Sequence, residues 1–149
     1  MIEVFTDGSS RGNPGPGGYG VVLKAGAHYK ELSEGFRLTT NNRMELLAVI
    51  VALEALKQPG HRVHITSDSK YVIDAVVKGW VFGWEKKDFA KKMNPDLWRR
   101  FLKVYRKHQV QFQWIKGHNG HKENERCDAL AVQAALNGPL QVDYGYEQL

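Results

Sequence analysis

Four acidic residues, far apart along the chain, have the type and placement to do chemistry together: Asp7, Glu45, Asp68 and Asp128. Carboxylates crowded at one place repel each other, which raises their pKa values unless a cation neutralises them. Oxygen ligands without a cysteine and histidine cluster select hard ions such as Mg²⁺ or Mn²⁺. Two such ions can activate water and stabilise the leaving oxygen in phosphodiester cleavage. If the four side chains converge, they predict the chemistry of a metal-dependent nuclease.

Each of these carboxylates also has a purely structural interpretation. Asp7 could be a turn residue, and Asp68 could cap a helix. Glu45 could complete a capping box with Asn42, three residues earlier, and Asp128 could be a surface acid near a helix N-terminus. Taken one by one, these interpretations stay open, and only the four residues together favour a metal site.

The apolar periodicity and the positions of glycine and proline predict the elements that must position these residues. In chain order they are strands at 2–6, 20–25 and 28–37, a helix at 43–57, a strand at 62–66, helices at 69–77 and 95–107, a strand at 110–115 and a helix at 123–136.

This βββαβααβα order predicts an α/β fold that begins with a meander, in which the third strand is parallel to the first. A helical crossover would then set strand 62–66 parallel to strand 2–6. If these two strands are neighbours, their carboxyl ends share one edge of the sheet, where open α/β sheets place their sites. Asp7 and Asp68, each just past such a strand end, would lie side by side there.

The composition is that of a globular protein. The 149 residues are 42% hydrophobic and 25% charged, which excludes a disordered chain or a coiled coil. We expect a single domain over residues 1–149, with a loosely held tail from about residue 140 that could be disordered. The sequence has neither a signal peptide nor an apolar stretch long enough to cross a bilayer. We therefore expect a cytoplasmic monomer without a membrane partner.

The excess positive charge is concentrated in one segment. The net charge is +5, yet residues 84–107 alone hold nine basic and three acidic side chains. Lysines that neutralise phosphates, interleaved with rings that pack on sugar or base, suit a nucleic acid. The alternative is a solvated, lysine-rich helix whose aromatic residues face the core. The interleaved aromatic residues are Trp80, Phe82, Trp84, Phe89 and Trp98.

His118 lies in a glycine-rich loop between strand 110–115 and the helix that carries Asp128. A histidine beside metal-bound carboxylates could shuttle protons or help the product to leave. A loop histidine could equally be a solvated side chain, and its position in the sequence alone does not decide between the two.

Six short motifs give the chain a resemblance to the bacterial-type (type 1) ribonuclease H family over nearly its whole length. They are FTDGS (5–9), GNPGPGGYG (12–20), TNNRMEL (40–46), SDS (67–69), WIKGH (114–118) and NERCD (124–128). The resemblance implies a five-stranded mixed sheet flanked by helices. It also implies endonucleolytic hydrolysis of the RNA strand of RNA–DNA hybrids, leaving 5′-phosphate and 3′-hydroxyl ends.

The resemblance further assigns roles to individual residues. The four carboxylates would bind two Mg²⁺ ions, which Mn²⁺ could replace, and His118 would assist turnover. Asn13 and Asn41 would contact the RNA backbone and 2′-hydroxyl groups, and Thr40 would contact a DNA phosphate. Residues 80–98 would form a basic arm that binds the hybrid, with Trp80 against the DNA strand. The other arm residues expected to bind substrate are Trp84, Lys86, Lys87, Lys91 and Lys92.

The chain departs from the family pattern at two points. Lys70 stands where many relatives carry glutamine, so that substrate contact cannot be carried over unchanged. The basic arm looks shorter than in well-known relatives, which concerns affinity rather than chemistry. Two other functions stay open, a nuclease of the same fold that cuts DNA and a non-catalytic module that only binds hybrids.

Overall fold

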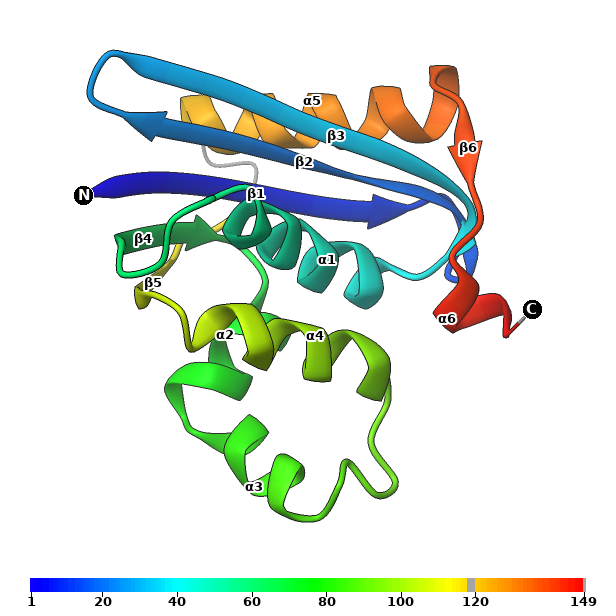
Figure 1. Ribbon diagram of the computed structural model, residues 1–149. Coiled ribbons are helices and arrows are strands. Elements are labelled where there is room, and N and C mark those ends of the chain that lie inside the picture. Colours follow the sequence, from blue (N-terminus) through cyan, green and yellow to red (C-terminus); the bar gives the residue numbers. More distant parts are fainter. Residues whose placement is uncertain (118–119, 149) are drawn as a thin grey trace.

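The computed structural model describes residues 1–117 and 120–148, in which six strands form one mixed sheet (Figure 1). The spatial order of the strands is β5-β4-β1-β2-β3-β6. β1, β2 and β3 form an antiparallel meander, β4 pairs parallel with β1, β5 with β4, and β6 with β3. The strand bounds are β1 (Ile2–Ser10), β2 (Gly15–Ala25), β3 (His28–Thr39), β4 (Arg62–Ser67), β5 (Gln109–Trp114) and β6 (Leu140–Gln141).

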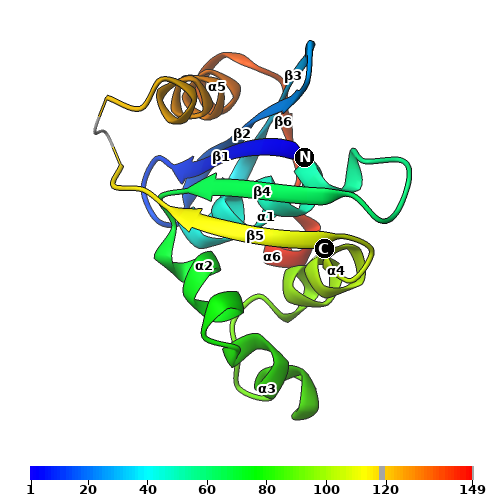
Figure 2. The same ribbon diagram turned by 90° about the vertical axis from the view of Figure 1, so that its left-hand side faces the viewer.

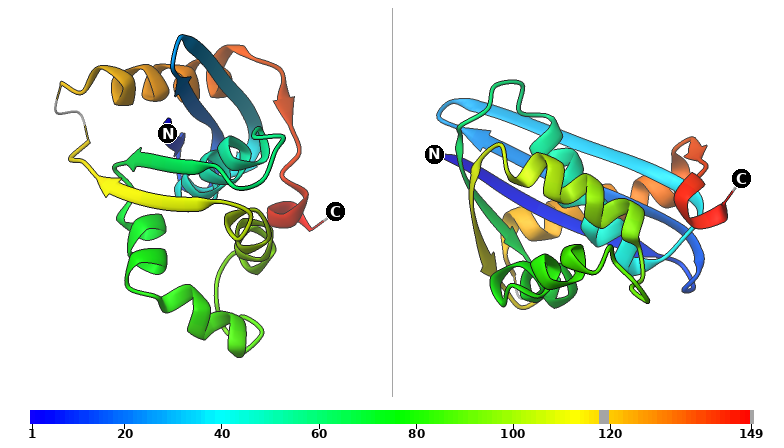
Figure 3. Two further views of the ribbon diagram at one scale, coloured as in Figure 1. Left: turned by 60° about the vertical axis from the view of Figure 1, so that its left-hand side comes forward. Right: turned by 60° about the horizontal axis from the view of Figure 1, so that its bottom comes forward.

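Helices cover both faces of the sheet (Figure 2). α5 packs on β1, β2 and β3 from one side, and α1 covers the other side with α4 packed against it. α2 leads away from the end of β4 to α3, which projects from the body of the molecule (Figure 3). The helix bounds are α1 (Asn41–Glu54), α2 (Lys70–Val77), α3 (Trp80–Lys86), α4 (Pro95–Tyr105), α5 (Lys122–Asn137) and α6 (Tyr144–Glu147).

Two glycines let helix backbone touch strand backbone. A Cβ atom on Gly8 of β1 would overlap the main chain of Met44 in α1. On the opposite face, a Cβ atom on Gly20 of β2 would overlap the carbonyl group of Cys127 in α5. A strand glycine often marks such a close approach of another backbone. In both helices, the residue that follows the contact is one of the four predicted carboxylates.

The apolar core supports this arrangement from both faces. The larger cluster of buried side chains lies between the sheet, α1 and α4, and Trp98 of α4 is fully buried within it. A smaller cluster under α5 contains Phe5, Val22, Cys127 and Leu130. At about 25 cal/mol for each Å² of apolar surface removed from water, these clusters supply the main force that holds the helices to the sheet.

The predicted α/β class and mixed sheet are confirmed, with one more strand and two more short helices than the order βββαβααβα contains. The added strand is β6, and the added helices are α3 and α6. α3 escaped prediction because WVFGWEK is only seven residues long and carries a glycine in its middle. The helix predicted at 43–57 spans Asn41–Glu54 instead, because Thr40 caps its start.

The segment from about residue 140, which we expect to be a loosely held tail, carries secondary structure within the described residues. Residues 140–148 contain β6 and α6, and the carboxylate of Asp143 is buried. Asp143 accepts hydrogen bonds from the guanidinium of Arg43, at 2.8 Å, and from the hydroxyl of Thr39, at 2.7 Å. These partners lie about a hundred residues earlier in the chain, so no local pattern could reveal them.

No helix within residues 1–117 and 120–148 is both long enough and apolar enough to pass through a membrane.

Candidate active site

β1 and β4 bring the first two carboxylates to one edge of the sheet. The two strands pair parallel as far as Phe5 and Thr66. β4 ends at Ser67, and Asp68 follows it as predicted. Asp7 lies within β1 rather than past its end, because β1 continues to pair with β2 as far as Ser10. The predicted edge is correct all the same, since Asp7 lies beyond the last residue that pairs with β4.

The contact at Gly8 positions Glu45. Because α1 touches β1 there, the amide N–H of Gly8 donates hydrogen bonds to the carboxylates of both Asp7 and Glu45. The capping box proposed for Glu45 and Asn42 is not formed, since the hydroxyl of Thr40 caps α1 by accepting from the amide of Arg43 at 3.3 Å. Glu45 therefore faces the strand rather than the start of its own helix.

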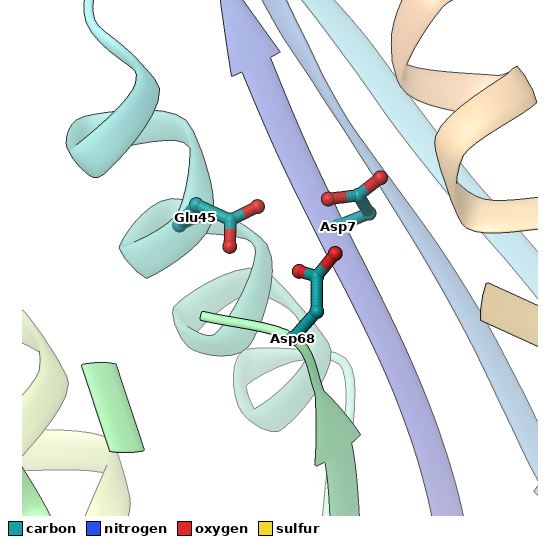
Figure 4. A group of neighbouring side chains, drawn as sticks. All are labelled: Asp7, Glu45 and Asp68. Carbon is teal, nitrogen blue, oxygen red and sulfur yellow. The ribbon is translucent and has the colours of Figure 1, made fainter. Parts of the chain in front are cut away.

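Three carboxylates converge at this point. Asp7, Glu45 and Asp68 each offer an oxygen, and these oxygens all lie within 4.8 Å of one another. The three side chains come from β1, α1 and the end of β4 and point toward a common space (Figure 4). The helix-cap interpretation of Asp68 is not borne out, because α2 is capped by the hydroxyl of Ser69, which accepts from Val72.

Asp128 lies at the same pocket, on the side of α5. It lines an open cavity of about 400 Å³ together with the other three carboxylates. The close contact between Gly20 and the carbonyl group of Cys127 holds this turn of α5 against the sheet. Asp128 is half-buried, and its negative charge acts on Asp7. Its ligand oxygen is not part of the tight group of three.

Burial and the convergence of these carboxylates raise the pKa values of Asp7 and Glu45. Burial raises the pKa of Asp7 to about 7, against a hydrogen bond with Glu45 that lowers it, and the charges of Asp68 and Asp128 raise it further. Burial, and then the charge of Asp7, raise the pKa of Glu45 well above its usual range. The three carboxylates repel one another, and a divalent cation among them would neutralise this repulsion. Their oxygen atoms are the ligands that hard cations such as Mg²⁺ or Mn²⁺ prefer.

The two asparagines predicted to meet the RNA strand are adjacent in space. The side-chain oxygen of Asn13 accepts from the amide of Asn41 at 3.1 Å, and the side-chain oxygen of Asn41 accepts from the amide of Ser10 at 2.6 Å. Both oxygens are thus used within the protein, and the NH₂ groups remain as donors at fixed positions. Thr40, predicted at a DNA phosphate, caps α1 directly beside them.

The basic arm, residues 80–98, divides into exposed and buried side chains. The ring of Trp80 is 49% exposed, whereas that of Trp98 is fully buried. Trp84, predicted to contact substrate, is half-buried, with its ring edge-on to Trp98 at 5.7 Å between centroids. The core-facing interpretation of the arm aromatics therefore holds for Trp98 and Phe89 but not for Trp80. The lysines predicted to bind substrate are all exposed, namely Lys86, Lys87, Lys91 and Lys92.

The loop between α3 and α4 has unusual backbone geometry and carries three of these lysines, Lys87, Lys91 and Lys92. Asp88, Phe89 and Lys91 all have positive φ angles, between 52° and 61°. Non-glycine residues rarely adopt this conformation, so neighbouring contacts must hold it. Arg99 of α4 supplies them: its guanidinium lies 5.1 Å from the ring centroid of the buried Phe89 and pairs with the carboxylate of Asp88 at 3.1 Å.

A buried ion-pair network, which the sequence did not predict, supports the start of α1. Arg43 is 3% exposed, and its guanidinium donates to Asp143, Asp96 and the side-chain oxygen of Asn94. Burial works to lower the pKa of Arg43, but hydrogen bonds to Asp96 and Asp143 raise it above its usual value. The network ties α1 to α4 and to the C-terminal segment. The only sequence signal was an arginine inside TNNRMEL.

His118, predicted to assist turnover, lies outside the described residues.

Comparisons with known proteins agree on one family. A family model described as RNase H matches residues 1–136. The chain is 54% identical to the ribonuclease H of Shewanella sp. (strain W3-18-1), over 99% of this chain and 96% of that one. It is 53% identical to the ribonuclease HI of Shewanella oneidensis, over 99% and 95% of the two chains.

Solved structures give the same result. LC9-RNase H1, described as a type 1 RNase H with the type 2 active-site motif, matches with a TM-score of 0.81 and 32% identity. That match covers 99% of this chain and 79% of the other. LC11-RNase H1 in complex with an RNA/DNA hybrid matches with a TM-score of 0.69 and 28% identity, over 91% of this chain and 96% of the other.

Proposed function

The chain belongs to the ribonuclease H family and hydrolyses the RNA strand of RNA–DNA hybrids, and we propose that it does so with two Mg²⁺ ions held by four carboxylates. The proposed ligands are Asp7, Glu45, Asp68 and Asp128. The observation that carries the assignment is the convergence of three of them, from distant segments, to within 4.8 Å at the wall of one open pocket.

The carboxylates hold the ions, and the chain supplies the rest of the site. When bound, the two ions would supply activation of a water molecule as the nucleophile and stabilisation of the departing 3′-oxygen, so that the products would carry 5′-phosphate and 3′-hydroxyl ends. Gly8 orients Asp7 and Glu45 by donating its amide N–H to both. Asp68 extends from the end of β4 toward them. Each ligand thus comes from a different rigid element, so the site is preorganised.

Recognition of the RNA strand falls to the paired asparagines. Because their oxygens are held within the protein, Asn13 and Asn41 present NH₂ donors toward the RNA backbone and its 2′-hydroxyl groups. The 2′-hydroxyl is the group by which a protein distinguishes RNA from DNA. Thr40, at the cap of α1, would donate its hydroxyl proton to a DNA phosphate; the hydrogen bond that its oxygen accepts from the amide of Arg43 leaves that proton available and supports this role.

The basic arm would hold the DNA strand. Its lysines supply charge that neutralises phosphates, and the exposed ring of Trp80 supplies a surface for a sugar or a base. Trp84 contributes by supporting Lys92, whose Nζ lies 5.1 Å from the Trp84 ring centroid. The position of His118 in the sequence, before the helix that carries Asp128, supports a role in proton transfer or product release.

A cleavage panel tests the proposal. Hybrid, duplex DNA, branched DNA and duplex RNA are incubated with the full chain, with and without Mg²⁺ and with Mn²⁺ in its place. We expect cleavage of the hybrid alone, only with a divalent ion, and none by Asp7→Asn or Asp68→Asn. Cleavage of DNA would favour a DNA nuclease of the same fold. Tight binding of the hybrid by the wild-type chain without cleavage would favour a non-catalytic module.

We also propose that the chain acts as a monomer in the cytoplasm. All ligands of the proposed site come from one chain, so catalysis needs no second copy. The relatives from Shewanella are bacterial, and a bacterial cell holds its DNA in the cytoplasm. Light scattering at working concentration tests the first statement, and cell fractionation tests the second.

A further inference from the structure

Lys70 is a basic residue at the wall of the acidic pocket. It is the first residue of α2, two positions after Asp68, and it lines the same cavity as the four carboxylates. Its side chain is exposed. A cation at a helix N-terminus is electrostatically unfavourable, because the helix dipole is positive there. The needs of α2 itself therefore do not explain a lysine at this position.

The ammonium group of Lys70 is held in place by an aromatic ring. Its Nζ lies 4.7 Å from the centroid of the Trp114 ring, within the range of a cation–π interaction. Trp114 is fixed in turn, since its indole N–H donates to the main-chain carbonyl of Asp68 at 3.0 Å, and its backbone pairs with Ser67 at the end of β4. The platform is thus attached to the strand end that carries Asp68.

This support leaves the charge of Lys70 available to a ligand. Among the described residues, no ion pair joins Lys70 to an acidic side chain. The face of a ring attracts the positive charge of an ammonium group. The N–H donors of that group can still form hydrogen bonds with a ligand. A preoriented ammonium group beside a metal-binding pocket is suited to an anion that enters that pocket as part of a larger molecule.

We propose that Lys70 binds a non-bridging oxygen of an RNA-strand phosphate that flanks the scissile one, with Trp114 as the platform that orients it. This inference rests on the proposed function. If the scissile phosphate lies at the carboxylates, its neighbours on the same strand are the anions that come nearest to this wall of the pocket. Lys70 is then a substrate-binding residue that acts through charge, independently of the asparagine pair.

The experiment combines a side-chain change with a charge change in the substrate. A strand with a short ribonucleotide stretch within DNA, paired to DNA, fixes the cleavage position. Each flanking phosphate is replaced in turn by an uncharged methylphosphonate. Wild type, Lys70→Met and Lys70→Arg are compared in kcat, KM, salt dependence and Mg²⁺ dependence. Methionine removes the charge and the N–H donors without supplying the amide that relatives carry at this position. Lys30→Met is the matched control, because it removes the same charge from an exposed position on β3, outside the lining of the pocket.

We expect Lys70→Met to raise KM by about 5- to 10-fold, as for one charge-assisted hydrogen bond at a partly exposed site, with kcat nearly unchanged. The slope of log KM against log salt should fall by about 0.7–0.9, the value for one neutralised phosphate. Lys70→Arg should keep most of the affinity. One of the two methylphosphonates should weaken the wild type by a similar factor and leave Lys70→Met unaffected.

Three results would overturn the inference. They are an unchanged KM in Lys70→Met, an equal response of wild type and Lys70→Met to both methylphosphonates, and a shift in the Mg²⁺ requirement in place of a change in the salt slope. The last result would mean that Lys70 acts on the metal site. Failure of the wild-type chain to cleave any hybrid would instead refute the proposed function, so the two failures are distinguishable.

Discussion

Asp7→Asn should make the metal-free protein more stable while it abolishes cleavage. Asp7 is buried between Glu45, Asp68 and Asp128, and its pKa rises from 3.8 to about 7 on folding. A carboxyl with a raised pKa in the folded state costs stability as the pH rises from its unfolded pKa to its folded pKa. Asparagine has nearly the same shape, keeps an oxygen for the amide of Gly8, and carries no charge.

The size of the gain follows from the shift. About three pKa units at about 1.4 kcal/mol each give an upper bound of about 4 kcal/mol at pH values above 7. Part of this is offset, because a buried amide needs its own hydrogen-bond partners. We therefore expect a gain of about 2–4 kcal/mol, which for a chain of this size raises Tm by roughly 5–15 °C.

Urea unfolding in the presence of a chelator measures the effect. The difference between Asp7→Asn and wild type should be largest near about pH 8 and should shrink as the pH falls toward about 4, where Asp7 of the folded wild type is protonated and, like asparagine, uncharged. Excess Mg²⁺ should stabilise the wild type more than the variant. Glu125→Gln, which removes an exposed charge on α5, should change stability by less than about 0.5 kcal/mol.

Two results would refute the reasoning. If the variant is no more stable than the wild type at about pH 8, Asp7 is not held at an electrostatic cost. If the gain is the same at every pH, it comes from packing or hydrogen bonding and not from the removed charge.

Three further predictions concern the surroundings of the site. Replacing the four arm lysines at 86, 87, 91 and 92 with alanine should weaken hybrid binding. The slope of log affinity against log salt should fall by about 0.7–0.9 for each phosphate that the arm no longer neutralises. Unchanged binding at every salt concentration would mean that these lysines are only solvated surface residues. Asp143→Asn should lower the free energy of unfolding, measured in urea, by about 2–3 kcal/mol. The buried guanidinium of Arg43 then keeps Asp96 as its remaining acidic partner among the described residues. A loss below about 0.5 kcal/mol would show that the fold does not need this network. His118→Ala should slow turnover by roughly tenfold or more at unchanged Mg²⁺ affinity, and a weaker Mg²⁺ affinity would contradict its assigned role.

Local pattern predicted most of the fold because most elements carry their own signals. Strand 62–66 alternates polar and apolar residues, and Pro95 marks the start of α4. α3 and α6 lack such signals. Their positions depend on tertiary contacts, such as the fully buried Val81 of α3 and the pairing of Asp143 with Arg43. A method that examines one window at a time has no access to a partner a hundred residues away.

The candidate site was more predictable than its surroundings for a related reason. Strand topology alone places Asp7 and Asp68 at one edge of the sheet, because it depends on strand order and not on side-chain packing. It could not place Glu45, because that residue depends on how closely α1 approaches β1. Nor could it separate the exposed Trp80 from the half-buried Trp84, which are one helical turn apart and have the same composition around them.

Two glycines show what fixes the positions of the carboxylates on the helices. In the sequence, Gly8 belongs to a glycine-rich stretch and Gly20 to the start of a predicted strand, yet both mark points where helix backbone touches strand backbone. Any side chain at these positions would move α1 or α5 away from β1 and β2, and a carboxylate with it. Repulsion between buried carboxylates would push the helices away from the strands if the contacts between them were loose. A cluster such as this one therefore needs rigid contacts between helix and strand backbone. Gly8 and Gly20, each in contact with the residue that precedes a helix-borne acid, are therefore as much a part of the proposed metal site as the acids themselves.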